Sequence, residues 1–428
     1  MVVLVQKNLN LRSSAIDKNI IQSTFCKFFQ PIFCEKFLGV IRKLKLDRYI
    51  KKLQTIQLIL ILIYGQIQQQ KSLPVLVNNF NNQDFCKAVN LNSISVSQLS
   101  RRLNHLPSKV LHLLFQESVL LLHAKTGVSS AVKQVGPLHI IDSSTITLSL
   151  TKYRWAKYRK SKSGIKLHLQ LKLLDGYLYP DAATLTCAKV ADSKELDKLV
   201  VEDPNIMYVF DRGYIDYKRF DEYCEHDIRF TSRLKDSAIV TVISENPVTP
   251  GGAVRRDCIV KLGDGKTKMQ HKLRLIEVFD TRGNLLSIIT NDLKAPAAEI
   301  GQIYRYRWQI ELFFKWIKQH FSVKHFYATS PNAVENQIYI ALIAYCLLQL
   351  LKIETGCPKS LLEMTRILTE CIYESYDEFV RKLHFKSSRT SKGRRKIDFK
   401  TEYLVLERQV LDALNPSYID DLVFELMY

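Results

Sequence analysis

The feature that most constrains the fold is a change of hydrophobic period near residue 138. Before it, segments such as VLHLLFQESVLLLHA (110–124) place apolar residues at the 3.6-residue spacing of an amphipathic helix. After it, GIKLHLQLKLL (164–174) alternates residue by residue, which is the period of a β-strand. Leu167, Leu169, Leu171 and Leu173 share one face, and the opposite face carries Lys166, His168, Gln170 and Lys172.

The segments that follow residue 138 predict a mixed α/β core. LHIIDSSTITLSL (138–150) also alternates, and an Asp-Gly turn at 175–176 joins strand 164–174 to a third strand. We then expect a helix near 192–199, a short buried strand at 206–210 and another helix. Between 227 and 292, short alternating runs separated by TPGG, GDGK and TRGN predict an antiparallel β insert.

These patterns divide the chain into five segments. We predict a helical N-terminal domain (1–130), a first part of the α/β core (131–226), the β insert (227–292), a second part of the core (293–352) and a helical C-terminal region (353–428) with a basic loop at 385–396.

The charge of the chain predicts a polyanionic partner. The net charge is +20 at pH 7, and a globular chain this basic usually meets nucleic acid or an acidic membrane face. A soluble protein that is merely basic has the same charge, so charge alone does not decide.

The cysteines and the apolar runs indicate a cytoplasmic protein. The nine cysteines form no CxxC pair, which argues against a disulfide framework or a zinc site. The N-terminus has too short an apolar run for a signal peptide. The runs at 58–64 and 338–351 fall short of the ~20 residues of a membrane span, so we expect buried core helices and no membrane partner.

Two basic segments are candidates for DNA binding. SISVSQLSRRLNHL (93–106) predicts a serine-capped helix that presents Arg101 and Arg102, although an ordinary solvated helix face fits equally well. TKYRWAKYRKSKSGIK (151–166) combines seven Lys or Arg with three aromatics and no acid, a pattern suited to phosphates and bases. Its candidate contacts are Lys157, Arg159, Lys160 and Lys162.

Two aspartates, one on a predicted strand and one directly after another, are candidates for a functional site. Asp142 shares a mostly apolar strand face, where a carboxylate needs a cation or strong donors. Asp211 follows the buried strand 206–210, and ligands gather at the carboxyl ends of such strands. A local turn at Asp142 and a helix N-cap at Asp211 explain the same residues without any site.

YRYRWQIELFFKWIKQH (304–320) predicts one amphipathic helix. Its apolar stripe consists of Ile303, Ile310, Phe314, Ile317 and Phe321. At the edge of this stripe, within an arc of about 60°, lie Tyr304, Arg307, Glu311 and Lys318. An exposed ion-pair face at i,i+4 spacing is the alternative.

The spacing Tyr-x2-Arg-x3-Glu-x6-Lys resembles the signature helix of one branch of the DDE transposases of bacterial insertion sequences. That resemblance covers about 138–350. It implies an RNase H-like core with catalytic acids on the first strand, after the fourth strand and on a later helix, and a β insert before that helix. Asp142, Asp211 and Glu311 take those places, and Trp308 also resembles the family.

The resemblance implies an enzyme that cuts the ends of its mobile element and joins them to target DNA. It implies two Mg²⁺ ions, which Mn²⁺ can replace, bound by the three acids. Arg307, Lys318 and Tyr304 would contact phosphates. The partners would be double-stranded DNA and a second copy of the chain, in a synaptic dimer, in a bacterial cytoplasm on the nucleoid, with the N-terminal domain a candidate for binding DNA ends.

One departure and two alternatives stay open. Relatives that pass through a DNA hairpin flip a base against an aromatic residue of the insert, but all three tryptophans lie outside it, which leaves Phe230 or Phe279. A DNA-binding protein without catalysis has no reason to keep all three acids. A different RNase H-like nuclease is disfavoured by the signature helix and the insert.

Overall fold

The computed structural model describes residues 23–126, 136–174, 177–249, 252–279, 283–321, 323 and 325–385. The predicted Asp-Gly turn at 175–176 and all but the first residue of the predicted basic loop lie outside these ranges. Residues 1–383 form one compact unit, and the fold below is that of its described part.

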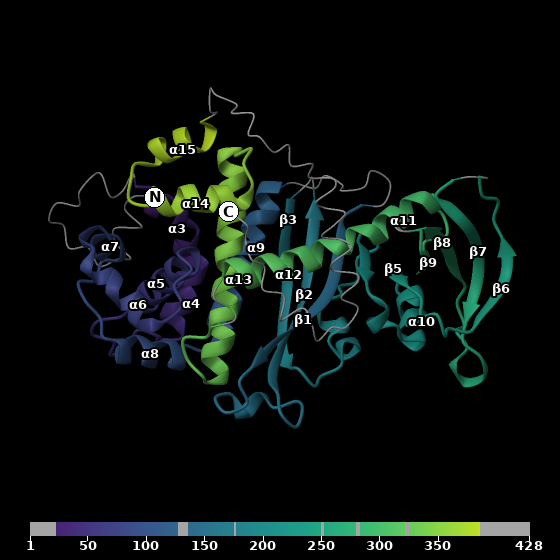
Figure 1. Ribbon diagram of the computed structural model, residues 1–428, viewed down its shortest axis with the longest axis horizontal. Helices are drawn as coiled ribbons and strands as arrows, with labels where there is room; N and C mark the ends of the chain where they lie inside the picture. Colours follow the sequence, from purple (N-terminus) through teal and green to yellow (C-terminus); the bar gives the residue numbers. More distant parts are fainter. Residues whose placement is uncertain are drawn as a thin grey trace, which may run out of the picture. The chain divides into compact units, whose positions relative to one another are not determined.

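A single nine-stranded sheet runs through this unit (Figure 1). Its strands are β1 Leu138–Leu148, β2 Ser163–Leu174, β3 Tyr177–Cys187, β4 Met207–Phe210, β5 Arg229–Arg233, β6 Val240–Glu245, β7 Val254–Leu262, β8 Leu273–Phe279 and β9 Leu285–Thr290. They lie in the order β3-β2-β1-β4-β5-β9-β8-β7-β6. The first three strands are antiparallel, and β4 and β5 run parallel to β1. The first five strands therefore have the order and directions of an RNase H-like core, which confirms the expected fold class.

The β insert joins this sheet instead of standing apart from it. Strand β5 falls in the range predicted for the insert, yet it pairs in parallel with β4. Strand β9 then pairs antiparallel with β5, and β8, β7 and β6 follow. The hydrogen-bonding edge of β5, which would otherwise be unpaired, is covered in this way.

Helices flank the sheet and build the N-terminal part. They are α3 Thr24–Phe29, α4 Glu35–Lys43, α5 Thr55–Ile67, α6 Leu73–Asn78, α7 Gln83–Val89, α8 Val96–His105, α9 Ser108–Thr126, α10 Tyr217–Glu225, α11 Ala297–Tyr306, α12 Trp308–His320, α13 Pro331–Thr355, α14 Leu361–Glu370 and α15 Tyr376–His384. The helix predicted near 192–199 is instead two short 3-10 turns, Asp192–Lys194 and Leu196–Lys198.

The longest helix among the described residues, α13, is a core helix. It packs against α9, α5 and β3. The helix extends beyond the apolar run 338–351: with 25 residues and a mean hydropathy of 1.6 over its most apolar window, it has the length and composition of a membrane span. Most of it is buried within the unit. The buried amide of Asn336 donates to the backbone carbonyls of Leu103 and Leu106 on and after α8, a contact that ties the core to the N-terminal helices.

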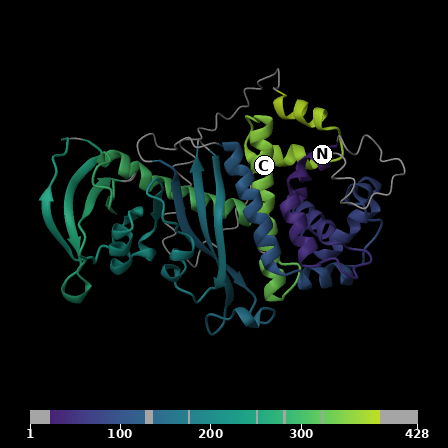
Figure 2. The same cartoon turned by 180° about the vertical axis from the view of Figure 1, so that it is seen from behind.

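The signature helix is interrupted at Arg307. Residue 307 separates α11 from α12, and its N–H donates to the carbonyl of Tyr304 while its own carbonyl accepts from Ile310. Both bonds span three residues, which makes a tight turn, and Arg307 keeps helical angles (φ −51°, ψ −33°). The predicted apolar stripe is buried throughout. Figures 1 and 2, from opposite sides, place α11 and α12 on one face of the sheet.

Candidate active site

Asp142 and Asp211 lie side by side on neighbouring strands. In the parallel pairing of β1 with β4, Ile141 is opposite Phe210, so the next residue of each chain segment is one of the two aspartates. Neighbouring strands run about 4.8 Å apart. Asp142 lies within β1, which continues to Leu148, whereas Asp211 follows the last residue of β4. The register of two buried strands therefore fixes both carboxylates.

The turn between α11 and α12 brings the third acid to the same place. The guanidinium of Arg307 lies 2.7 Å from Oε1 of Glu311 and 3.6 Å from Oδ2 of Asp142. The hydroxyl of Tyr304 donates to Oδ1 of Asp211 at 3.3 Å. Arg307 is largely enclosed, with 16% of its side chain exposed. Two residues of the signature, Arg307 and Tyr304, thus contact all three acids.

Burial and mutual repulsion control the charge of these acids. Burial, together with Glu311 and Asp211, raises the pKa of Asp142 to about 7 against the opposing effects of Arg307 and the Ser143 N–H. Burial likewise raises the pKa of Glu311, which Arg307 lowers and Asp211 raises. The carboxylates are therefore within electrostatic reach of one another, and a nearby cation stabilises their ionised forms.

The donor set fits a hard divalent cation, but Arg307 holds the central position. Carboxylate oxygens are the ligands that Mg²⁺ prefers. Among the described residues, however, no three His, Cys, Asp or Glu side chains are grouped closely enough to hold an ion. The acids instead surround the guanidinium, whose buried Nε has no hydrogen-bond partner in the described structure. Arg307 therefore supplies the positive charge next to Asp142 and Glu311 in this structure.

The remaining signature residue and the N-terminal arginines make contacts within the protein. Lys318 Nζ donates to the carbonyl of Thr145 on β1 at 3.3 Å. Helix α8 begins after the predicted serine cap, Ser95. Arg102 donates from this helix to the Leu53 carbonyl and lies 3.0 Å from Asp47, which favours a structural role. Arg101, by contrast, is exposed.

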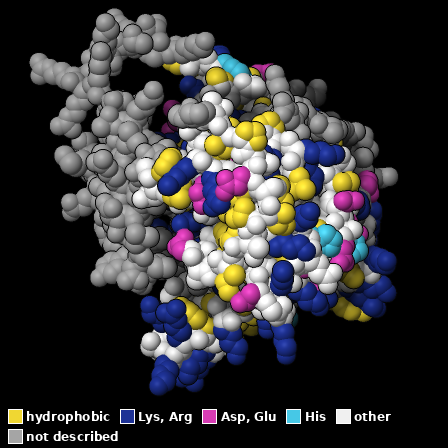
Figure 3. Space-filling model, turned by 90° about the vertical axis from the view of Figure 1, so that its right-hand side faces the viewer, with side chains coloured by type: hydrophobic (Ala, Val, Ile, Leu, Met, Phe, Trp, Pro, Cys, Tyr) yellow, Lys and Arg dark blue, Asp and Glu magenta, His cyan; other side chains and the backbone are white. Residues whose placement is uncertain are grey.

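The predicted basic segment after β1 is largely solvent-exposed. Its four candidate contacts are all exposed: Lys157, Arg159, Lys160 and Lys162. On the face of the molecule seen in Figure 3, Lys and Arg side chains are more numerous than Asp and Glu. The structure brings none of these four residues to the acids through a contact in the described part of the chain, so their role in binding DNA stays a prediction.

The two candidate aromatic residues for base flipping differ in access. Phe230 is fully buried in β5 and stacks on Phe220, with ring centroids 4.4 Å apart. Phe279 ends β8 with 41% of its surface exposed, and the guanidinium of Arg255 lies 6.0 Å from its ring centroid. Of the two, only Phe279 can reach a base without unfolding of the core.

A polar cluster behind Asp142 was not found by the sequence analysis. The hydroxyl of Ser143, on the opposite face of β1, donates to Oδ1 of Asp192 at 2.6 Å. Lys166 Nζ lies 3.0 Å from the same oxygen, and His168 Nδ1 lies 3.6 Å from it. The polar face of strand 164–174 could have indicated this cluster, because cations on a central strand need a carboxylate partner. Asp192 was predicted only to begin a helix.

Tyr214 also borders this cluster. It lies in the 3-10 turn Arg212–Tyr214 that follows Asp211, and its buried hydroxyl has no hydrogen-bond partner in the described part of the chain. Burial raises the pKa of its hydroxyl, and Asp142 and Asp192 raise it further.

Comparisons with known proteins show the family to which the chain is similar. The family described as "Transposase DDE domain" matches residues 133–347. The "Putative transposase y4zB" of Sinorhizobium fredii is 31% identical over 252 residues, which is 56% of this chain and 68% of the relative. The "Probable transposase for insertion sequence element IS5377" of Geobacillus stearothermophilus is 30% identical over 221 residues, or 51% of this chain and 58% of the relative.

A solved structure was also found, a "piggyBac transposase synaptic complex with hairpin DNA". It has a TM-score of 0.43 and 13% identity, and the match covers 93% of this chain and 92% of that one. The family match spans half of the 428-residue chain and includes all three acids, so the chain belongs to the DDE transposase family of insertion sequence elements, enzymes that cleave DNA and transfer its strands.

Proposed function

We propose that Asp142, Asp211 and Glu311 are the catalytic acids with which this transposase cuts the ends of its own mobile element and joins them to target DNA. One observation supports this most strongly. Residues from β1, from the end of β4 and from α12 come within electrostatic reach of one another, and the signature residues Arg307 and Tyr304 contact all three. An ordinary solvated helix face would not direct these groups onto the sheet.

The three acids are the residues that would hold divalent metal, which we propose to be two Mg²⁺ ions. When bound, such ions polarise the scissile phosphate and lower the pKa of an attacking water or 3′-hydroxyl. The acids supply the negative charge that attracts the ions. The register of β1 with β4 keeps two of the carboxylates in place before any ion arrives.

The cationic and phenolic signature residues position the DNA backbone in this proposal. Arg307 neutralises Asp142 and Glu311 in the structure and, once displaced, is close enough to pair with a phosphate near the scissile bond. Tyr304 orients Asp211 through its hydrogen bond. Lys318 sits against β1 two turns farther along α12, where its ammonium can follow the same strand of DNA.

The family and the relatives support an inference about where the protein acts and on which partners. The matched relatives are from bacteria, and we infer that the protein acts in the bacterial cytoplasm on double-stranded DNA. Two ends must be brought together for one element to move, so we propose that a homodimer holds both ends.

The experiment that tests the proposal separates binding from chemistry. Glu311→Gln keeps the shape of the side chain and removes its charge, so strand cleavage should be lost while binding to the element's ends persists. Glu299→Gln, in the first turn of α11, is the matched control and should cleave normally. Normal cleavage by Glu311→Gln would remove it from the catalytic set, and loss of binding together with cleavage would mark it as structural.

A further inference from the structure

The two edges of the nine-stranded sheet differ in how they are protected. At one edge, Pro180 and a shift of register interrupt β3, and His123 of α9 lies 2.6 Å from the carboxylate of Asp181 on that strand. Proline, an irregular register and a packed helix are ways in which proteins block the pairing of an edge strand. At the other edge, β6 has a single neighbour, β7, among the described strands (Figure 1).

The open edge at β6 is apolar and uncharged. Residues 239–244, IVTVIS, contain neither a charged residue nor a proline. Ile239, Val242 and Ile243 are each 40–51% exposed, and every residue from Thr241 to Glu245 is exposed. β-Branched residues on an extended strand with an unpaired edge favour the addition of another strand. This edge is therefore a candidate interaction surface.

The pairing with β7 determines which backbone groups of β6 point outward. The N–H of Gly263 donates to the carbonyl of Ile239 at 2.9 Å, and Thr241 is paired in the same register, two residues farther along. Bonded and non-bonded positions alternate in an antiparallel pair. Ile239 and Thr241 therefore bond to β7, whereas the N–H and carbonyl groups of Val240 and Val242 point away from the sheet. A bulge at Ile243 ends this regular stretch.

These outward groups are self-complementary across a two-fold axis at Thr241. When two β6 edges meet antiparallel about this axis, Val240 lies opposite Val242 of the partner subunit and exchanges two backbone hydrogen bonds with it. The symmetric pair does the same. Ile239 then lies opposite Ile243 of the partner subunit, so apolar side chains meet on both faces of the joined sheet. A shift of one residue would instead bring inward-pointing groups to the contact.

We propose that two copies of this chain pair edge to edge through β6, which joins their sheets into one. The proposal rests on the proposed function in one respect, because it assigns an interface to the homodimer that holds both DNA ends. A two-fold symmetric interface uses the same patch on both copies and requires that patch to be complementary to itself. Residues 239–243 meet this requirement in their backbone groups and in their side chains.

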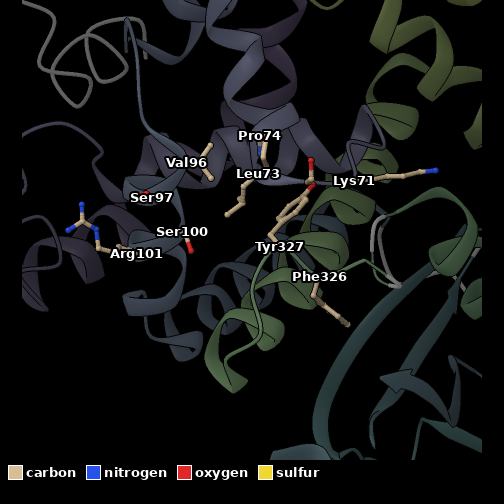
Figure 4. Close-up of a pocket in the computed structure, with 10 residues that line it drawn as sticks. Lys71, Leu73, Pro74, Val96, Ser97, Ser100, Arg101, Phe326 and Tyr327 are labelled. Carbon is tan, nitrogen blue, oxygen red and sulfur yellow. The ribbon is translucent and has the colours of Figure 1, made fainter. Parts of the chain in front are cut away.

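The charge of the chain favours a contact between copies at this neutral segment. Each copy carries a net charge of +20, so the cationic surfaces of two copies repel each other. The pocket in Figure 4, for example, is lined by Lys71 and Arg101 and by no acid. Residues 239–244 carry no charge, and Glu245 next to them is paired with Arg256 at 2.6 Å. Two basic copies can therefore approach each other at β6.

The length of this edge predicts a weak pair in free solution. Residues 239–243 span about 17 Å at ~3.3 Å per residue, and a contact this short falls below the roughly 1,200 Å² that stable complexes bury. Pairing should therefore be reversible and depend on protein concentration. Two copies bound to the ends of one DNA molecule should pair more fully, because the DNA raises their effective concentration.

Disulfide cross-linking of the full chain tests the register. In the proposed pair the Cα atoms of the two copies of Thr241 lie about 4.5 Å apart, as in other non-hydrogen-bonded antiparallel pairs, which is within disulfide reach. Thr241→Cys should therefore form a covalent dimer under a mild oxidant. Ser244→Cys is the matched control on the same strand, because its two copies lie about 20 Å apart, three residues on either side of the axis. The unmodified protein, with its nine cysteines, gives the background.

Sedimentation of the full chain measures the pairing without a cross-link. Val242→Pro removes an outward N–H that β7 does not use, so the fold should persist while dimerisation weakens by about 30-fold, from the loss of one backbone bond in each copy. Val242→Thr keeps the backbone groups and the β-branched shape and should pair normally. Added salt should strengthen the pairing because it screens the repulsion between like charges, whereas an association bridged by DNA weakens in salt.

Any of three results overturns the proposal: equal cross-linking of Thr241→Cys and Ser244→Cys, a monomer at every protein and salt concentration, or undiminished pairing of folded Val242→Pro. Failure of the proposed function is distinguishable from these results. If Glu311→Gln cleaves normally, the acids are not catalytic, even when Thr241→Cys cross-links. If Glu311→Gln loses cleavage and Thr241→Cys does not cross-link, the acids are catalytic and β6 is not the interface.

Discussion

Arg307 is the residue on which the geometry of the acids depends. It pairs with Glu311 one turn away and with Asp142, which lies 165 positions earlier in the chain. Burial alone would lower the pKa of its guanidinium, but Tyr304 and the three acids outweigh burial and raise it. Its positive charge is therefore permanent, and it compensates carboxylates that would otherwise repel each other.

Replacement of Arg307 by Met should destabilise the protein at pH 7. Removal of one partner of a buried ion pair costs about 3–5 kcal/mol, and the lower value applies because Glu311 is 35% exposed. Urea unfolding measures the change. Arg307→Met/Glu311→Gln should recover part of the loss, and Mg²⁺ should stabilise the single variant more than the unmodified protein. If the single and double variants are equally stable, Arg307 and Glu311 are not coupled.

Asp192 acts on the site through β1. Its carboxylate binds the hydroxyl of Ser143, whose N–H donates to the carboxylate of Asp142. We expect Asp192→Asn to reduce strand cleavage by about 10- to 100-fold, the usual effect of losing an outer-shell partner, with DNA affinity unchanged. Single-turnover cleavage and equilibrium binding measure the two effects. Asp197→Asn, a 59% exposed aspartate nearby, is the control. Equal loss in both variants would contradict a positioning role.

At the scale of elements, a buried ion pair joins two neighbouring strands of the β insert, β7 and β8. Arg274 on β8 holds Asp257 on β7 through two bonds of 2.8 and 2.7 Å. Both side chains are less than a tenth exposed. A third bond from Arg274 to the Ala295 carbonyl reaches the segment before α11. The insert thus supports the start of the helical segment that carries Arg307 and Glu311.

This pair predicts instability in acid. Burial by itself would raise the pKa of Asp257, but Arg274 and Asn246 outweigh burial and lower it. A carboxyl with a lowered folded-state pKa contributes stability above its unfolded value of about 3.9. That contribution is lost as the pH falls through the lowered pKa. Unfolding measured from pH 7 to pH 3 should show it.

The control for the acid effect is Asp257→Asn. This variant should be less stable than the unmodified protein at pH 7 and should lose less additional stability below pH 4. Hydrogen exchange of residues 254–279 localises the effect to the insert. Parallel pH curves for the two proteins would mean that other carboxyls, such as Asp221 beside His271, account for the acid lability.

At the scale of the whole molecule, the net charge is +20, and many of the cations are exposed on the described surface. The segment after β1 carries the exposed cations Lys152 and Arg154 in addition to its four candidate DNA contacts. We therefore expect the exposed cations to contribute affinity for DNA over an extended surface, whereas the three acids occupy a small part of it.

Binding of any duplex should depend strongly on salt. Lys160→Ala should lower the slope of log K against log salt by about 0.9, and removal of all four cations Lys157, Arg159, Lys160 and Lys162 should lower it by up to about 3.6. Affinity for unrelated sequences should fall equally, because phosphates carry no sequence information. Lys218→Ala, 89% exposed and on α10, should change nothing. An unchanged slope after loss of all four cations would make this segment an ordinary solvated loop.

The sequence by itself determined the kind and order of the elements. Period-two alternation predicts β1 to β3, and the buried apolar stripe predicts which side of α12 meets the sheet. Such patterns depend on neighbours within a few positions, so they can be read locally. The same logic failed at 192–199 and at Arg307, where short turns replace helix because contacts with distant segments outweigh weak helical preference.

Only the tertiary structure decided which distant groups meet. The pairing of β5 with β9, the contact of Arg307 with Asp142 and the bond from Ser143 to Asp192 join residues 49 to 165 positions apart. No local period specifies them. They follow from the sheet register, in which a shift of one residue would turn Asp142 to the face of Ser143 and away from Arg307. The sequence thus supplied the three acids, and packing of the sheet against α12 made them one site.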